Sequence, residues 1–193
     1  MSVVVTVEPT SEPIGLDEVK SHLNVLSNDH DTYIDELIVA ARHHCQTYTR
    51  QAAMTTTFRK VLWCLPISGV INLEYPPLQT VTSIYYINSS GVSTLLATTE
   101  YVVDSDTKPG RIIRAYEKIW PVVRTSGVAA PITVVYVAGH ATQAAVPAEF
   151  RHAMKMLIGH WWMVREGAAQ VNFAEVPHAV NALLAGAAHG EYP

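Results

Sequence analysis

The chain has 193 residues and a formal net charge of −4, with 13 Lys and Arg against 17 Asp and Glu. Hydrophobic residues make up 49% of it and charged residues only 16%, against about 25% charged in an average soluble protein. This balance argues against a disordered chain, which needs high charge, and against a dedicated nucleic-acid binder, which needs a basic excess. The shortage of charge indicates that part of the surface is covered by something other than water.

The cysteines and the N-terminal residues limit further which classes of protein the chain can belong to. Cys45 and Cys64 are too few for a disulfide scaffold, and we expect two buried, reduced thiols. Residues 1–8 lack the basic and apolar segments of a signal peptide, and no apolar run approaches the about 18 residues of a membrane span. We therefore expect a protein that is made and used in soluble form, without a membrane partner.

Residues 14–50 are predicted to form two packed helices. The first has apolar residues at helical steps: Leu16, Val19, Leu23 and Leu26. A second apolar stripe runs from Ile34 to Tyr48 and predicts about four helical turns. The polar segment 27–31 between them is expected to supply side-chain acceptors for the free amides at the start of the second helix.

Residues 55–139 change to the period of β-strands and are predicted to form an antiparallel β-meander inserted between helices. The expected strands are residues 57–63, 70–73, 81–87, 101–103, 111–114 and 132–138. Turn residues separate them, since Gly provides a positive φ and Pro a preset φ.

Residues 146–185 return to a helical period. Pro147 is expected at the first position of one long helix, and Pro177 is expected to open a short one. The tail 186–193, rich in small residues, is expected to be mobile. Helices, then strands, then helices give an α+β fold: a helical bundle of two N-terminal helices plus one long and one short C-terminal helix, in a single domain over residues 1–193.

A search for chemistry finds no catalytic constellation. His140 and His152 lack a carboxylate or cysteine at ligand spacing, and the nucleophile and phosphate-loop motifs are absent. Asp104 and Asp106 flank Ser105 in a pattern that turn chemistry explains without a cation. We expect no metal site, no cofactor and no enzyme.

Aromatic residues are better candidates for contacts. Trp162 is predicted on a half-polar flank of the long helix that it shares with Lys155, Ile158, Gly159 and Arg165. Either a partner or another element of the same domain covers this flank. The pair Tyr85 and Tyr86 places one ring on each face of the sheet.

The ordered set of motifs resembles one known family. The matching segments are IGLDEVKSHL at 14–23, DTYIDELIVAAR at 31–42, LEYPPLQTVTSI at 73–84, YVV at 101–103, PGRI at 109–112, WP at 120–121, ITVVYVAGH at 132–140, VPAEF at 146–150, HWWMVREG at 160–167 and VPHAVNALL at 176–184. In this order they resemble the head-tail connector, or adaptor, proteins of long-tailed bacteriophages and phage-like particles.

The resemblance implies a structural subunit of the virion neck, assembled in the host cytoplasm. Such proteins form a ring, typically of twelve copies, beneath the portal protein. They extend the channel for double-stranded DNA without sequence-specific binding and offer a platform for a stopper or tail-completion protein. The chain departs from the family pattern after Leu184, where members often carry a basic segment and this chain does not.

Two sets of residues are expected at interfaces. The predicted portal or partner contacts are Trp162, Arg165, Pro177, Val180, Leu183 and Leu184. The predicted contacts between subunits are Tyr85, Tyr86 and Arg111. The alternatives are a small metal- or His-dependent enzyme using His140 and His152 with Glu149 or Asp104, and a monomeric ligand-binding module.

Overall fold

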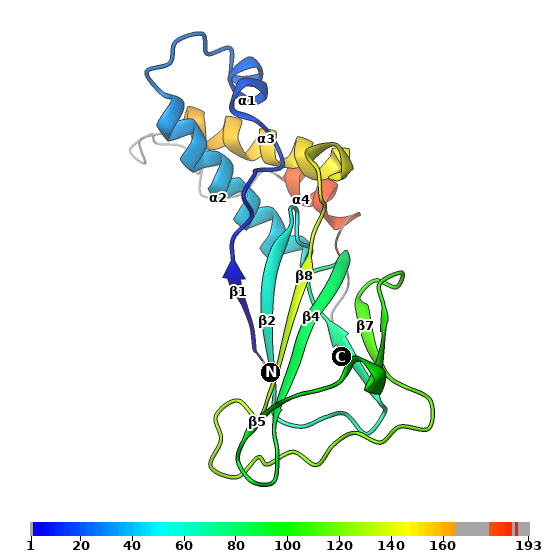
Figure 1. The fold of residues 1–193 in the computed structure, drawn as a ribbon. Helices are drawn as coiled ribbons and strands as arrows, with labels where there is room; N and C mark the ends of the chain where they lie inside the picture. The colour runs from blue at the N-terminus through cyan, green and yellow to red at the C-terminus, as the bar shows by residue number, and fades with distance from the viewer. Residues whose placement is uncertain (1, 165–177, 187, 189–193) are drawn as a thin grey trace. The chain divides into compact units, whose positions relative to one another are not determined.

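The computed structural model describes residues 2–164, 178–186 and 188. The chain divides into two compact units, and both are discontinuous in sequence (Figure 1). The β unit comprises residues 1–9 and 55–139, and the helical unit comprises residues 10–54 and 140–191. Whether the two units behave as the single domain expected from the sequence stays a prediction.

The described part of the helical unit has four α-helices: α1 (Leu16–Leu23), α2 (Asp31–Thr49), α3 (Ala148–Met163) and α4 (His178–Ala185). Their apolar stripes meet in one core, which includes Ile34, Ile38, Phe150 and Leu157, all almost inaccessible to solvent. Pro147 lies directly before α3, one position earlier than expected, because an N-terminal proline fits either place.

The connection between α1 and α2 differs from the prediction. Helix α1 ends at Leu23, and Leu26 is 98% exposed instead of continuing the apolar stripe. No side chain caps the start of α2. The polar residues of the connection bind α1 instead, since Lys20 Nζ donates to Asn28 Oδ1 at 2.6 Å and to Asp31 Oδ1 at 2.7 Å.

The β unit holds two antiparallel sheets. The larger has the order β1-β2-β8-β4-β5, from β1 (Ser2–Val7), β2 (Thr56–Leu62), β4 (Leu78–Ile87), β5 (Ser93–Leu95) and β8 (Ile132–Ala138). The smaller has the order β3-β7-β6, from β3 (Val70–Leu73), β6 (Tyr101–Asp104) and β7 (Gly110–Arg114). Short 3₁₀ turns, Thr98–Glu100 and Gln143–Ala145, complete the described elements.

One face of the larger sheet forms the core of the β unit. Phe58 stacks on Tyr75 with ring centroids 4.9 Å apart and on Tyr136 at 5.5 Å. The smaller sheet approaches this face closely, because a Cβ on Gly110 would lie 2.5 Å from Leu78 Cβ. We call this the inner sheet face.

A lysine lies within that core. Lys60 is only 3% exposed, and its ammonium group donates to Asn72 O at 2.6 Å and to both carboxylate oxygens of Glu74 at 2.7 and 2.9 Å. The hydroxyl of Tyr136 donates to Glu74 O at 3.0 Å. All three donors of Lys60 are thus satisfied, as a buried charge requires.

The predicted α+β class is confirmed, and each predicted strand is present with small shifts of its ends. The structure adds β1 and β5, which the sequence pattern does not predict. It also shows that the inserted strands do not follow one another in a simple meander, since β8 lies between β2 and β4.

Candidate interaction surfaces

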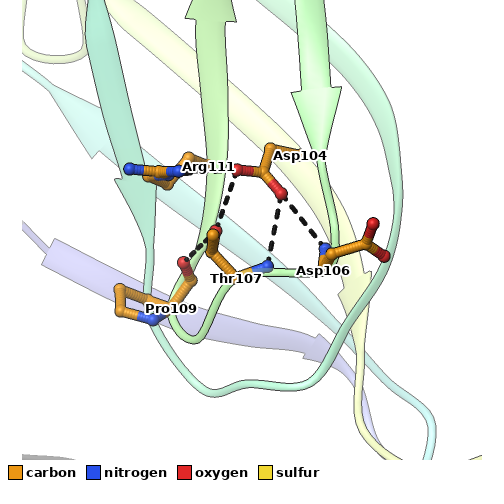
Figure 2. Close-up of polar contacts among 5 residues, drawn as sticks. All are labelled: Asp104, Asp106, Thr107, Pro109 and Arg111. Carbon is orange, nitrogen blue, oxygen red and sulfur yellow. Dashed lines mark hydrogen bonds and ion pairs between the residues drawn. The ribbon is translucent and has the colours of Figure 1, made fainter.

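The β6–β7 hairpin carries the predicted subunit contact Arg111 (Figure 2). Asp104 and Arg111 face each other in the antiparallel register, and Arg111 Nη2 donates to Asp104 Oδ2 at 2.7 Å. Asp104 Oδ1 accepts the amides of Asp106 and Thr107, each at 3.2 Å. The Thr107 hydroxyl lies 3.1 Å from both Asp104 Oδ2 and Pro109 O. As predicted, Asp104 is explained by turn chemistry.

The electrostatics of this turn follow from the same contacts. The hydrogen bond from Arg111, with smaller contributions from Thr107, lowers the pKa of the Asp104 carboxyl below its ordinary value. A general acid needs the opposite shift, so the environment of Asp104 does not favour that role. The Arg111 side chain keeps 40% of its surface exposed, and its role between subunits stays a prediction.

Tyr85 and Tyr86 lie on opposite faces of the larger sheet. Tyr86 pairs with Ile132 on the inner sheet face and is half-buried. Tyr85 pairs with Thr133 and Leu95 on the other face and is 42% exposed. Of the two, only Tyr85 offers a largely exposed ring.

The face that carries Tyr85 is here called the outer sheet face. The strand registers place on it Ser2, Val4 and Val7 of β1, Thr57, Arg59 and Val61 of β2, Thr80, Ser83 and Tyr85 of β4, Leu95 of β5, and Thr133, Val135 and Val137 of β8. Arg59 is the one charged residue in this set. The rest are Val, Leu, Tyr, Thr and Ser, so this surface is poor in charge and about half apolar.

A hollow of about 250 Å³ opens where β2 ends. It is lined by Ser2, Val61, Leu62, Trp63, Ala129 and Pro131. Sites for small molecules are usually about 300–1,000 Å³, so this hollow suits a side chain better than a ligand. Trp63 beside it is 59% exposed.

In the helical unit, the flank of α3 around Trp162 is covered by other helices of the same unit. Trp162 is half-buried and contacts His30 edge-on at 5.4 Å and Tyr33 at 6.1 Å between ring centroids. Lys155 Nζ lies 2.8 Å from Glu18 Oε1 of α1, and Ile158 is fully buried. Of the two alternatives for this flank, cover by another element of the same domain thus holds for most of it. A partner contact at Trp162 stays a prediction.

The residues predicted on α4 fall into two groups. Val180 and Leu184 are fully buried in the helical core, where they hold α4 on the bundle. Leu183 is half-buried, whereas His178, Ala179 and Ala182 are exposed. Arg165, Pro177 and most of the tail expected to be mobile lie outside the described residues.

The two thiols occupy different environments. Cys45 is fully buried, and burial raises the pKa of its thiol to about 12. Cys64 is exposed, so the expectation of two buried thiols is wrong for Cys64. The chain turns outward directly after Leu62, where β2 ends.

The described residues contain neither a cluster of metal ligands nor a membrane-spanning helix. Over residues 2–164, 178–186 and 188, no group of three or more His, Cys, Asp or Glu side chains lies close enough together to hold an ion. No helix in this part of the chain is long and apolar enough to cross a membrane.

Comparison with known proteins finds a family match over part of the chain. Residues 13–94 match the family of phage gp6-like head-tail connector proteins. This confirms the resemblance drawn from the sequence motifs, over the first two helices and the first part of the β unit. No curated protein matches the chain.

Solved structures extend the likeness in fold to the whole chain. A chain from the neck of an empty gene transfer agent (GTA) particle, computed with C6 symmetry, has a TM-score of 0.81 at 19% identity. A chain from the virion of a native gene transfer agent particle scores 0.80 at 20% identity. A chain from the neck of a native particle, computed with C12 symmetry, scores 0.74 at 21% identity. Each comparison covers 100% of this chain and 98% of the other.

Proposed function

We propose, from the match of residues 13–94 to the head-tail connector family, that the chain is a structural subunit joining the head to the tail of a phage or phage-like particle. The observation that carries this proposal is the agreement of two comparisons. The family match covers the first part of the chain, and the fold shared with neck proteins spans all of it. The role is structural and not enzymatic, as the family description implies.

Copies of the chain form a closed ring in the neck of the particle. The neck structures that contain similar chains were computed with sixfold and twelvefold symmetry, which supports a ring of twelve. A ring requires heterologous interfaces, in which one patch of each subunit meets a different patch of its neighbour. Two covered patches on each subunit explain why the chain needs so few surface charges.

The ring docks on a portal protein on one side and receives a stopper or tail-completion protein on the other, within the virion. Double-stranded DNA passes through its channel. A chain with a net charge of −4 offers little general attraction to phosphates, which favours sliding over binding. The exposed positions of α4 are the candidates for the portal contact, since Val180 and Leu184 are used by the core.

Sedimentation velocity and native mass spectrometry at rising concentration test the ring, alone and with the portal protein of the same particle. We expect rings or portal complexes with about twelve copies of the chain. A chain that stays monomeric at every concentration and ignores the portal protein would overturn the proposed function.

A substitution on α4 tests the portal contact separately. Ala182→Glu places a charge on an exposed helical position and should weaken portal binding by tenfold or more without changing the unfolding midpoint. Ala182→Ser is the matched control. Unchanged portal binding by Ala182→Glu would place the contact elsewhere on the chain.

A further inference from the structure

We propose that the outer sheet face is one half of the interface between subunits, and that residues 115–131 of a neighbouring copy occupy it. The inference rests on the proposed ring. Beyond the ring itself, it specifies which two surfaces of neighbouring subunits meet and which charged residues pair. We call residues 115–131 the docking loop.

The outer sheet face has the properties of a covered surface. Its side chains are mostly Val, Thr and Tyr, and those near its edges are well exposed: Val4 is 47%, Tyr85 42% and Leu95 55% accessible. Trp63 at the end of β2 adds a large ring that is 59% accessible. Large aromatic side chains in an apolar setting are the usual anchors of protein interfaces.

The docking loop connects β7 to β8 and contains neither a helix nor a strand (Figure 1). Three of its apolar side chains point into solvent, with Tyr116 88%, Ile119 83% and Val122 79% exposed. A loop of this length without secondary structure is uncommon in a compact unit unless it has a function. Exposed apolar side chains gathered on one loop indicate a contact with another protein.

The docking loop is nevertheless held in place. At one end, Ala115 N donates to Glu100 O at 3.0 Å, and Lys118 Nζ lies 2.9 Å from Glu100 Oε1. Further along, Arg124 N donates to Ile87 O at 2.9 Å. The three apolar side chains therefore project from a backbone that is already ordered. Such preorganisation reduces the entropy lost on binding.

Charge identifies the neighbour's docking loop as the occupant. Arg59 is the one charged residue on the outer sheet face, it is exposed, and no ion pair joins it to the described residues. Glu117 lies among the exposed apolar residues of the docking loop and likewise has no ion pair within the part of the chain that the structure describes. The docking loop also carries Lys118, which pairs with Glu100, and Arg124, whose Nε donates to Ser126 O at 3.4 Å. A sheet face whose one charge is an unpaired cation thus exists on the same chain as a loop whose one anion is unpaired.

The backbone at Glu117 supports this assignment. Its φ is +58°, in the left-handed region that non-glycine residues seldom adopt. Strained residues of this kind cluster at functional sites. A glycine would fit this turn without strain, so a glutamate at this position is consistent with a role for its side chain.

The arrangement leads to a ring. The outer sheet face and the docking loop are different surfaces, so their contact is heterologous and repeats from copy to copy. Beside Trp63, the hollow of about 250 Å³ can receive one side chain of the incoming loop; the end of the subunit's own docking loop, Ala129 and Pro131, forms one of its walls. Each subunit then gives its loop to one neighbour and its sheet face to the other.

Cross-linking tests the contact directly. In a Cys64→Ser background, which removes the exposed native thiol, Arg59→Cys and Glu117→Cys are made as separate chains. We expect a disulfide-linked dimer when the two chains are mixed under mild oxidation, and at least tenfold less from either chain alone. A doubly substituted chain should give a ladder of multimers. Asp106→Cys, an exposed acidic position in another turn, replaces Glu117→Cys in the matched control and should not cross-link.

Charge reversal gives a second readout on the assembled protein. Arg59→Glu and Glu117→Arg should each weaken assembly by about tenfold or more, and the double variant should restore most of it. Glu117→Gly should also weaken assembly while its unfolding midpoint stays equal or rises. Wild-type rings with no cross-link between the two positions and no rescue by the double variant would overturn this interface and leave the proposed function standing. Wild-type chains that form no assembly, alone or with the portal protein, would overturn both.

Discussion

The β unit and the helical unit have similar lengths but opposite surfaces. Of the seventeen large hydrophobic side chains exposed among the described residues, thirteen lie in the β unit and four in the helical unit. The helical unit has six Lys and Arg against eleven Asp and Glu, whereas the β unit has seven against six. The low charge of the whole chain therefore hides one acidic, well-solvated unit and one nearly neutral unit with an apolar surface.

This contrast locates the surface that needs a partner. The helical unit keeps its apolar side chains in its core and pairs its lysines with carboxylates on its own helices, as in Lys20–Asp31 and Lys155–Glu18. The β unit also has ion pairs at its surface, but it buries the Lys60–Glu74 pair and exposes large side chains such as Trp63. We infer that contacts between copies fall mainly on the β unit.

The largest effect on stability is expected in the core of the helical unit. Phe150→Ala leaves a cavity where the ring is now 1% exposed, and such truncations cost about 3–5 kcal/mol. Denaturant unfolding followed by circular dichroism at 222 nm measures the loss. If the units unfold independently, only the helical transition should move. Val39→Ala, at a position 37% exposed on α2, is the control and should change the free energy of unfolding by less than about 0.5 kcal/mol.

The next effect is expected at the buried charge of the β unit. Lys60→Met leaves the Glu74 carboxylate and Asn72 O without their donor. Because Glu74 is 24% exposed, water compensates in part, and we expect a loss of about 1.5–3 kcal/mol. Denaturant unfolding followed by tryptophan fluorescence measures the loss, with Trp161 and Trp162 of the helical unit replaced by Phe so that the signal comes from Trp63 and Trp120. Adding Glu74→Leu should recover part of the loss, and no recovery would contradict the assigned ion pair.

A smaller, pH-dependent effect is expected from Asp104. Its pKa is lowered in the folded chain by Arg111, so the folded state binds this proton more weakly than the unfolded state. The resulting stability is present above the ordinary carboxyl pKa of about 4 and is lost as the pH falls below it. Melting temperatures at pH 3 and pH 7 should differ less in Asp104→Asn than in wild type. Asp106→Asn is the control, and an equal change in both variants would remove Asp104 as the cause.

The smallest effect on stability is expected from modifying Cys64. Because Cys64 is exposed and Cys45 is buried, a thiol reagent at pH 8 should label one thiol at once and the second only on unfolding. The labelled chain should keep its unfolding midpoint. Rapid labelling of both thiols in the native chain would show that the core around Cys45 opens readily.

The sequence predicted the elements whose pattern reflects burial. Strand β8 was predicted with its bounds because Ile132, Val134 and Tyr136 alternate with half-exposed residues. The run of β-branched residues in β1 was also a strand signal. It was missed because an edge strand with exposed valines lacks that alternation.

The candidate surfaces were harder to predict. Val180 and Leu184 were assigned to a partner, but periodicity alone does not distinguish a stripe that faces the unit's own core from one that faces another protein. The docking loop was not predicted at all. Exposure of Tyr116 or Ile119 depends on tertiary contacts that fix the backbone of residues 115–131, such as those to Glu100 and Ile87, and these are not local in sequence.

The interleaved order of the chain has a consequence for its synthesis. The β unit contains the first strand and ends with residue 139, whereas the helical unit contains α1 and α2 but needs α3 and α4 to close its core. During translation, β1 therefore cannot pair with β2 until both N-terminal helices have been synthesised. Long-range pairings of this kind slow folding. The β unit is complete first, so the surface proposed for assembly is present while the helical pair α1–α2 still lacks its partners.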